Sequence, residues 1–521
     1  MERNKSGVKG EAKVQIIHRR FATTLILMLL VALTAVAQDG IRMRGCRRGM
    51  LLEPTPLFRA QETPRHAGGD FYCGDRRQLV ILAAFRDRQF EDDDSTTLAK
   101  WDKIFNTDNY HEDSFVGSVH DYFYDQSYGQ FNLKFDLIRV NLPDSCKKYR
   151  STNVDENSQY MVDDIVDTLQ TLDIDWSQYD WNDDGYVNQI LIIYAGEGQN
   201  AGGNYNTIWP HQWWLSLHLD LSNPEPDKYR SYRTVYDGDR EYRIDCYCCM
   251  QEMINSGYIQ STFGTICHEY SHCFGLPDFY DGYTKYVGEW DLMDYGNYNG
   301  GGFCPPNYSA HERWLMGWVN PVELSANTSV SDMPALCDEP QAYLIRNDGH
   351  EDEYYLVENR QQTGWDQDIP GSGLVVFHVD FDESIWTSIE ELTNSRNIVR
   401  YSIIPANNKS RYSLSNCAGW AYPYAVSYSP SPVYNDSLTN NSAPAATLNK
   451  ANTDGNKLMN KSLRDIHVKD GLASFRFTID QTAGIVALEP EGEPLELYRV
   501  GPVGILRYPN GVVKKVIKGL H

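Results

Sequence analysis

The most informative segment of the sequence is GTICHEYSHCFGLPDFYDGYTKYVGEWDLMDYG, residues 264–296. It contains His268-Glu269-x-x-His272, and residues four apart on a helix lie on one face, about one turn from each other. This spacing predicts that the two imidazoles bind one metal ion from the same side. Glu269 follows the first ligand, where a carboxylate can take a proton from a water molecule on the metal. We therefore expect a metal-binding helix over residues 263–274.

The residues after the second histidine predict how the site is completed. Gly275 tolerates the left-handed backbone that ends many helices, and Pro277 disfavours continuation of the helix. The chain should then turn and bring Asp278 to the metal as a third ligand, leaving a fourth position open as in catalytic zinc sites. Glu289 is the alternative third ligand, because it is also a carboxylate close after the helix.

Several blocks of the chain resemble the secreted metallopeptidases of the immune inhibitor A family. They are HEYSHCFGLPDFYD, GEWDLMDYG and SAHERWLMGW, with SVHDYFYDQSYGQF, YDWNDDGYVNQILIIYAGEG and IWPHQW upstream and EYYLVENRQQTGWD and GSGLVVFHVD downstream. The resemblance covers roughly residues 76–480 and implies a zinc endopeptidase made with a pro-segment. GEWDLMDYG looks like the methionine turn of metzincins, which places Met293 beneath the metal.

This reading gives each candidate residue a role. Zn²⁺ is expected to be held by His268, His272 and Asp278, and Glu269 is expected to act as general base towards the attacking water. Tyr295, just past the methionine turn, is a candidate hydrogen-bond donor to the oxyanion. The apolar strand expected over residues 190–194 is, by analogy with metzincins, a candidate to pair with extended substrate.

The overall composition narrows the class of partner. Hydrophobic residues make up 41% of the 521 residues and aromatic residues 12%, which favours packed globular structure with more than one core. A net charge of −24 argues against nucleic acid, whose phosphates would repel the chain. We expect a monomer that acts on protein or peptide substrates.

The N-terminus predicts export. Arg19 and Arg20 precede an apolar run from about residue 24 to residue 36, and Ala35-Val36-Ala37 has the pattern of a signal-peptide cleavage site. The run is short for a membrane span, so we expect no stable membrane insertion after cleavage, with an uncleaved anchor as the alternative. The protein is therefore expected to be secreted or located at the cell surface.

The pattern of elements predicts an α+β protein, with a metzincin-like α/β catalytic domain followed by a β-rich domain of sandwich type. Strands and helices alternate before the metal-binding helix, whereas short alternating strands dominate after Pro321. The ending NGVVKKVIK faintly resembles a sorting tail. The predicted parts are a signal peptide (1–37), a pro-segment (38–75), the catalytic domain (76–322), the β-rich domain (323–480) and a C-terminal tail with a possible sorting signal (481–521).

A second cation site is suggested by Asp180-x-Asn182-x-Asp184-Gly185, which resembles the start of an EF-hand loop. The twelfth position of that loop is Leu191, where calcium loops place a glutamate. The sequence therefore allows either a Ca²⁺ site at Asp180, Asn182 and Asp184 or an ordinary turn before a strand.

All eleven cysteines lie after the predicted cleavage site, where disulfides are permitted. Cys246-x-Cys248-Cys249 is interpreted as a source of disulfides in preference to a second metal cluster. Cys46 and Cys73, in the predicted pro-segment, are candidates for a thiolate that blocks the open zinc position, although an ordinary disulfide or a spare thiol is the simpler interpretation.

The main hypothesis is thus a secreted zinc-dependent endopeptidase. One rival is a non-catalytic surface binding or adhesion protein that retains a metal site, which the β-rich half allows. Another is a calcium-stabilised carbohydrate-binding module built on the Asp180 loop.

Overall fold

The fold is taken from a computed structural model of the chain. Its described residues are 71–150, 157–201, 206–217, 232–253, 262–281, 284–386, 392–409, 414–427, 433–480, 495–500, 503–508 and 513–517. The predicted signal peptide, most of the predicted pro-segment and Cys46 lie outside these ranges. The chain forms two compact units, residues 1–478 and 479–521.

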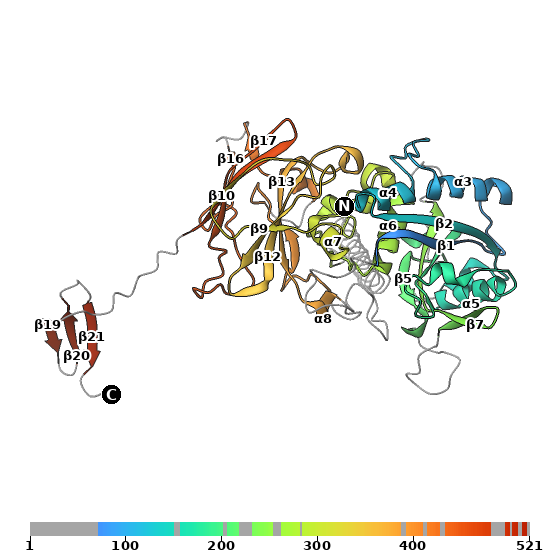
Figure 1. The fold of residues 1–521 in the computed structure, drawn as a ribbon, viewed down its shortest axis with the longest axis horizontal. Coiled ribbons are helices and arrows are strands. Elements are labelled where there is room, and N and C mark those ends of the chain that lie inside the picture. Colours follow the sequence, from blue (N-terminus) through green and yellow to red (C-terminus); the bar gives the residue numbers. More distant parts are fainter. Residues whose placement is uncertain are drawn as a thin grey trace, which may run out of the picture. The chain divides into compact units, whose positions relative to one another are not determined.

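The first half of the larger unit is organised around a five-stranded sheet in the order β2-β1-β4-β8-β5 (Figure 1). Strands β1 (Gly74–Ala84), β2 (Phe131–Asn141), β4 (Ile190–Glu197) and β8 (Cys246–Met253) run parallel, and β5 (His211–Trp214) pairs antiparallel with β8 at the edge. The strand expected to pair with substrate is β4, but it lies between β1 and β8. Both of its edges are hydrogen-bonded, so this expectation was wrong.

Both faces of the sheet are buried, which explains why β1 reads as one continuous apolar run. Its even-numbered residues Val80, Leu82 and Ala84 belong to one core, and its odd-numbered residues Leu79 and Ile81 belong to a second core on the opposite face. This alternation follows from the period of two in a strand. The sheet thus separates two hydrophobic layers that need different covering helices.

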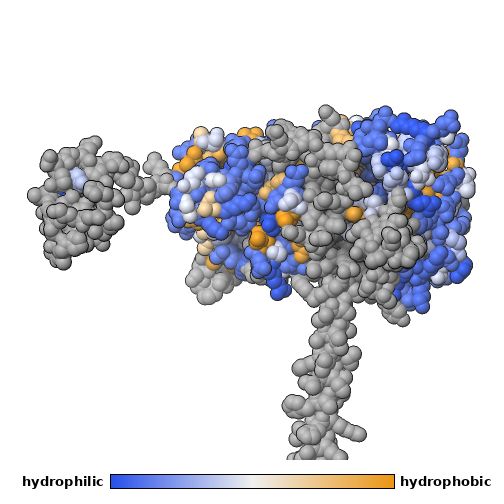
Figure 2. Space-filling view, turned by 90° about the horizontal axis from the view of Figure 1, so that it is seen from below, coloured by the Kyte–Doolittle hydropathy of each residue, from blue (hydrophilic) through white to orange (hydrophobic). Residues whose placement is uncertain are grey.

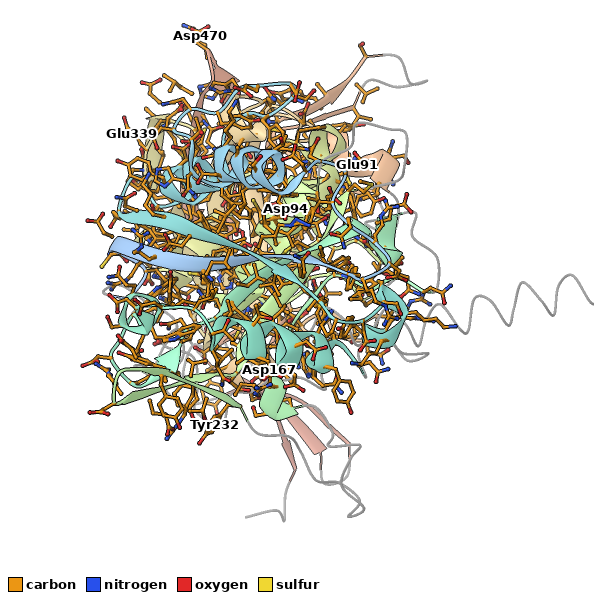
Figure 3. All side chains as sticks on the ribbon, turned by 90° about the vertical axis from the view of Figure 1, so that its right-hand side faces the viewer. Glu91, Asp94, Asp167, Tyr232, Glu339 and Asp470 are labelled. Carbon is orange, nitrogen blue, oxygen red and sulfur yellow. The ribbon has the colours of Figure 1, made fainter. Side chains whose placement is uncertain are left out.

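Helices cover the two faces as their apolar residues require. The first face carries α3 (Asp94–Asn106), α4 (Val119–Gln126) and α6 (Phe263–Cys273), and the second carries α5 (Ser158–Leu169). Figure 3 shows α3 and α5 on opposite sides of the sheet, marked by Asp94 and Asp167. The N-cap of α3 is Asp93, whose carboxylate accepts the N–H groups of Ser95 and Thr96.

The described chain enters this core before β1. Tyr72 is buried; its hydroxyl donates to the carbonyl of Phe274 (3.3 Å), and its own carbonyl accepts the indole N–H of Trp318 (2.8 Å). Gly74 already belongs to β1. Residues just ahead of the predicted boundary at 75 are therefore packed with the catalytic segment.

Short elements complete this half. They are β3 (Tyr186–Val187), β6 (Arg233–Asp237) and β7 (Arg240–Ile244), which form a small sheet, and α7 (Ala310–Leu315) with its capping box between Ser309 and Glu312.

The second half of the larger unit is rich in strands. One sheet has the order β14-β13-β12-β11-β9 and another the order β10-β18-β17. Side chains from both sheets, among them Tyr355, Val376 and Phe475, share a third core. The bounds are β9 (Val322–Glu323), β10 (Thr328–Met333), β11 (Tyr343–Asn347), β12 (His350–Arg360), β13 (Gly373–Asp380), α8 (Glu383–Trp386), β14 (Tyr401–Ile403), β15 (Tyr424–Val426), β16 (Val433–Asn435), β17 (Lys461–Lys469) and β18 (Leu472–Ile479).

The smaller unit contains three antiparallel strands, β19 (Leu495–Val500), β20 (Val503–Arg507) and β21 (Val513–Ile517). The α+β class predicted from sequence is confirmed by this mixture of helices and mainly separate sheets. The metzincin-like and sandwich descriptions stay predictions, as do the domain limits and the sorting signal.

The described surface is mainly hydrophilic on the face shown in Figure 2. Among the described helices, none combines the length and the apolar character needed to cross a bilayer.

Candidate metal centre

Helix α6 brings the two histidines of the HExxH pattern onto one face. Their ring centroids lie 4.9 Å apart with an interplanar angle of 85°. The helix ends as the sequence predicted: Gly275 adopts a positive φ of 94°, and its N–H donates to the carbonyl of His272 (2.9 Å). The left-handed residue turns the chain sharply back towards the helix.

That turn delivers Asp278 to the two imidazoles. Its Oδ1 lies 3.3 Å from Nε2 of His268 and 3.5 Å from Nε2 of His272. One donor atom from each of the three residues lies within 4.8 Å of the other two. Glu289, the alternative third ligand, is not part of this group. The structure brings together the predicted trio, whereas Glu289 is half-buried and lies outside that group.

Main-chain carbonyls orient both imidazoles. Nδ1 of His268 lies 2.9 Å from the carbonyl oxygen of Leu292, and Nδ1 of His272 lies 2.7 Å from that of Leu276. A carbonyl only accepts, so Nδ1 must carry the proton in each ring. The lone pairs of the neutral rings are therefore at Nε2, facing Asp278, which is how metal-binding histidines are fixed in proteins.

The trio fits a divalent cation. His268, His272 and Asp278 are 3%, 1% and 7% exposed. Nε2 of His272 and Oδ1 of Asp278 are buried without a hydrogen-bond partner in the described part of the chain. Buried polar atoms are rarely left unpaired, and two imidazole nitrogens with one carboxylate oxygen are a donor set typical of zinc.

The electrostatics without a cation point the same way. Burial lowers the pKa of His268, but the neighbouring carboxylate of Asp278 and the charge of Glu269 outweigh it and raise that pKa to about 9. Burial raises the pKa of Asp278, yet the positive histidines reverse the effect and leave it lowered. The site thus favours positive charge between its donors.

Glu269 lies on α6 between the ligands and is buried. Burial raises its pKa, whereas the charges of His268 and His272 oppose that rise. Asp278 and His211 also act on it electrostatically. The carboxylate is therefore close to all three donors and in a setting that makes it more basic than a surface glutamate.

The segment around Met293 supports both ligand-bearing segments. Met293 is fully buried; its carbonyl accepts the N–H of Phe279 (2.9 Å), the residue after Asp278, while the preceding carbonyl of Leu292 orients His268. One turn therefore braces the helix and the third donor together.

Tyr295 is placed differently from the trio. It is half-buried, its ring lies 5.1 Å from that of Tyr298, and the Lys285 ammonium lies 5.0 Å from its centroid. None of these contacts involves the three donors. Its assignment as oxyanion donor stays a prediction.

The predicted calcium loop is held by its own hydrogen bonds. The carboxylate of Asp180 accepts the N–H groups of Asp184 (3.0 Å) and Gly185 (2.9 Å), and Arg240 lies 3.5 Å from it. The amide of Asn182 donates to Asp184 (2.8 Å). No metal-type group of three is found at this loop among the described residues, and calcium binding stays a prediction.

The cysteine cluster corrects a further expectation. Cys246, Cys248 and Cys273 are thiols, so the disulfides expected from residues 246–249 do not form between them. Cys246 and Cys248 point to the face covered by α6, whereas Cys249 points to the other core. Strand alternation thus separates the adjacent pair Cys248 and Cys249 across the sheet.

The sequence block IWPHQW suggests that His211 lies close to the cleft but assigns it no role, and in the structure its charge acts on Glu269. His211 is buried on β5, with Nδ1 2.7 Å from the carbonyl of Trp209 and Nε2 3.1 Å from the Tyr247 hydroxyl. The carbonyls of Leu276 and Leu292 were also missed, because a main-chain acceptor leaves no mark on side-chain pattern.

Comparisons with known proteins agree with this geometry. Residues 75–316 match the family described as immune inhibitor A peptidase M6, catalytic domain. Immune inhibitor A of Bacillus thuringiensis subsp. alesti is 26% identical over 306 residues, covering 49% of this chain and 42% of that protein. The pre-pro-metalloprotease PrtV of Vibrio cholerae serotype O1 (strain M66-2) is 27% identical over 211 residues, covering 34% of this chain and 21% of that protein.

The chain therefore spans less than half the length of these curated relatives. The matched segment nevertheless contains the whole trio, Glu269 and the Met293 turn, and the match agrees with the resemblance noted in the sequence. Residues 75–316 therefore form a catalytic domain of the immune inhibitor A family of M6 peptidases.

Proposed function

We propose that this chain is a zinc-dependent endopeptidase whose metal is held by His268, His272 and Asp278. The observation that carries the proposal is the convergence of three buried donor atoms, two of them without hydrogen-bond partners in the described structure. The match of residues 75–316 to a peptidase family supports hydrolysis of peptide bonds, and one relative, PrtV, is named a metalloprotease. Protein or peptide substrates follow from that chemistry.

Zinc bound there would supply a Lewis acid that acidifies water and polarises the scissile carbonyl. Glu269 acts as general base: it takes the proton from the attacking water and passes it to the leaving amine. Burial raises its pKa, which makes it a better proton acceptor than an exposed glutamate. Water attacks directly, so no side chain of this protein becomes acylated.

Two finer features belong to the same proposal. Tyr295 follows the Met293 turn and would donate a hydrogen bond to the oxyanion once substrate is bound. The sheet with its antiparallel edge strand β5 and the HExxH helix beneath it supports a metzincin-like catalytic half, followed by a sandwich-type β-rich half.

Export is also proposed, on the basis of the signal-type N-terminus of residues 1–37. The mature protein would then act outside the cell or on its surface. Sequencing the N-terminus of protein recovered from culture medium tests this, and a start at Met1 would contradict it.

The decisive experiment is Glu269→Gln, which keeps size and hydrogen bonding but removes the base. Cleavage of casein should fall by about 10²–10⁴-fold, the usual contribution of general acid–base catalysis, while zinc content per chain stays at the parental value. Tyr295→Phe is the companion variant and should lower kcat with little change in KM.

Casein cleavage by Glu269→Gln at the parental rate would refute the general-base assignment. A parent that binds zinc but cleaves no protein, with or without chelator, would favour the adhesion alternative instead.

A further inference from the structure

The residue that follows the third donor is held from the β-rich half of the molecule. Phe279 donates its N–H to Met293, and its carbonyl accepts Nδ2 of Asn394 (2.8 Å). Its ring stacks on Tyr401, with centroids 3.9 Å apart and an interplanar angle of 29°. Phe279, the residue after Asp278, is therefore held through its N–H, its carbonyl and one face of its ring.

Tyr401, the first residue of β14, also contacts the segment around Met293. Its hydroxyl lies 3.1 Å from Oδ2 of Asp291 and 2.7 Å from Oγ of Ser309. The second oxygen of Asp291 accepts the N–H of Met293 (2.8 Å). One buried tyrosine thus contacts the segment of the third donor with its ring and the Met293 turn with its hydroxyl.

Asn394 fixes that tyrosine in place. Its Oδ1 accepts the N–H groups of Arg400 and Tyr401 (2.8 Å each), and its Nδ2 donates to the carbonyl of Tyr401 (2.7 Å) as well as to Phe279. Asn394 and Tyr401 are both completely buried. A side chain with all its hydrogen-bonding groups used in this way leaves little freedom to the segments it joins.

We propose that Tyr401 and Asn394 are positioning residues of the metal centre. They set the distance between two segments. One contains Asp278 and Phe279, and the other is the turn whose Leu292 carbonyl orients His268. Metal affinity depends on such outer partners because donors must be held within a few tenths of an ångström of their bound positions. This inference rests on the proposed zinc site and assigns the β-rich half a part in building it.

The test uses metal binding itself. Tyr401→Phe keeps the ring on Phe279 and removes the hydroxyl, and Asn394→Asp replaces the donor to the Phe279 carbonyl by an acceptor. Zinc affinity is measured in the full chain by competition with a chromophoric chelator, and the absorption spectrum of the Co²⁺-loaded protein reports donor geometry. Each variant should bind zinc roughly 10-fold more weakly, the lower end for outer partners of metal ligands, and shift the Co²⁺ bands.

Tyr355→Phe is the matched control. Tyr355 is a buried tyrosine on β12 of the same sheet, but it lies in the third core and its hydroxyl donates to the carbonyl of Thr447 (2.6 Å). Its loss should leave zinc affinity and the Co²⁺ spectrum unchanged, with melting temperatures of the metal-free proteins compared in parallel.

Parental affinity and an unshifted spectrum in Tyr401→Phe and Asn394→Asp would overturn the positioning role while leaving the proposed enzyme intact. An equal loss in Tyr355→Phe would also overturn it, because the effect would then be general destabilisation. A parent that binds neither metal would instead bring down the proposed function.

Discussion

Two clusters of metal-type side chains lie in the described structure, and they differ in what else their donor atoms bind. The first is the trio His268, His272 and Asp278; the second is Asp108, His120 and Asp121. In the second, Nε2 of His120 lies 3.4 Å from Asp108, and the Lys134 ammonium lies 3.4 Å from both. A cation supplied by the protein therefore already contacts two of the donors.

The remaining carboxylates sharpen the contrast. Asp121 accepts three backbone N–H groups, from Asn109 (3.0 Å), Tyr110 (3.1 Å) and Ser118 (2.8 Å), as the partner of a helix capping box. Asp108 is exposed, whereas all of the first trio is buried. Residue type and proximity are thus shared by both clusters. The clusters differ in the other contacts of their donor atoms. In the first cluster the donor atoms converge without other partners, whereas in the second they already bind groups of the protein.

The largest effect is expected when one histidine is removed from each cluster, which tests whether the two clusters differ in zinc binding. His272→Ala should weaken zinc binding by about 100-fold, because a four-ligand site of roughly 10–16 kcal/mol supplies about 3 kcal/mol per ligand. His120→Ala should leave zinc affinity unchanged. Equilibrium dialysis with metal analysis measures both affinities, and equal losses in the two variants would show that the two clusters do not differ in zinc binding.

A second prediction uses the burial that surrounds the first trio. Burial raises the pKa of Asp291 from 3.8 to about 7, although the N–H of Met293 opposes the rise. The folded protein therefore holds this proton more tightly than the unfolded chain, so the stabilisation is complete below about pH 4 and is lost as pH rises towards 7. Asp291→Asn cannot lose a proton and should escape that loss.

The measurement is the melting temperature of metal-free protein at pH 5 and pH 8. The drop between them should be smaller by about 2–4 °C in Asp291→Asn than in the parent. The exposed carboxylate of the other cluster provides the control, since Asp108→Asn should follow the parental curve. Identical drops in all three proteins would contradict the assignment.

The smallest effect is expected where the second cluster is opened. Lys134→Met removes the internal ammonium and leaves Asp108 and His120 facing each other, so a weak site for Zn²⁺ or Co²⁺ should appear, with affinity far below that of the first trio. Isothermal titration calorimetry in a Glu269→Gln, His272→Ala background measures the heat of metal binding to the second cluster with little contribution from the first. Silence in that titration would mean that the Asp121 cap, and not Lys134, keeps the second cluster from binding metal.

Most of the first trio could be predicted from local sequence. The two histidines, Gly275 and Asp278 all lie within residues 268–278, so helical periodicity and backbone preference could predict them. Strand β1 could also be predicted, because a strand that is buried on both faces appears in the sequence as a continuous apolar run. Local pattern could not predict which residues far apart in the sequence contact each other.

Particular residues show where that limit falls. Tyr401 lies more than one hundred positions from Asp291, and nothing in its surroundings in the sequence marks it as a contact of the metal centre. The interior place of β4 depends on strand order, which the alternation of side chains does not encode. The cysteines at 246–249 were misjudged because pairing depends on which face of β8 each thiol occupies.

The grip of Tyr401 and Asn394 on Phe279 has a practical consequence for anyone dividing this chain. A gene fragment ending at residue 316 would encode every proposed ligand and the base, yet it would strip Phe279 of its stacking partner and leave the Trp290 indole without the Cys417 carbonyl that it binds at 3.1 Å. The smallest piece worth transplanting between relatives, or evolving on its own, therefore runs on to residue 478.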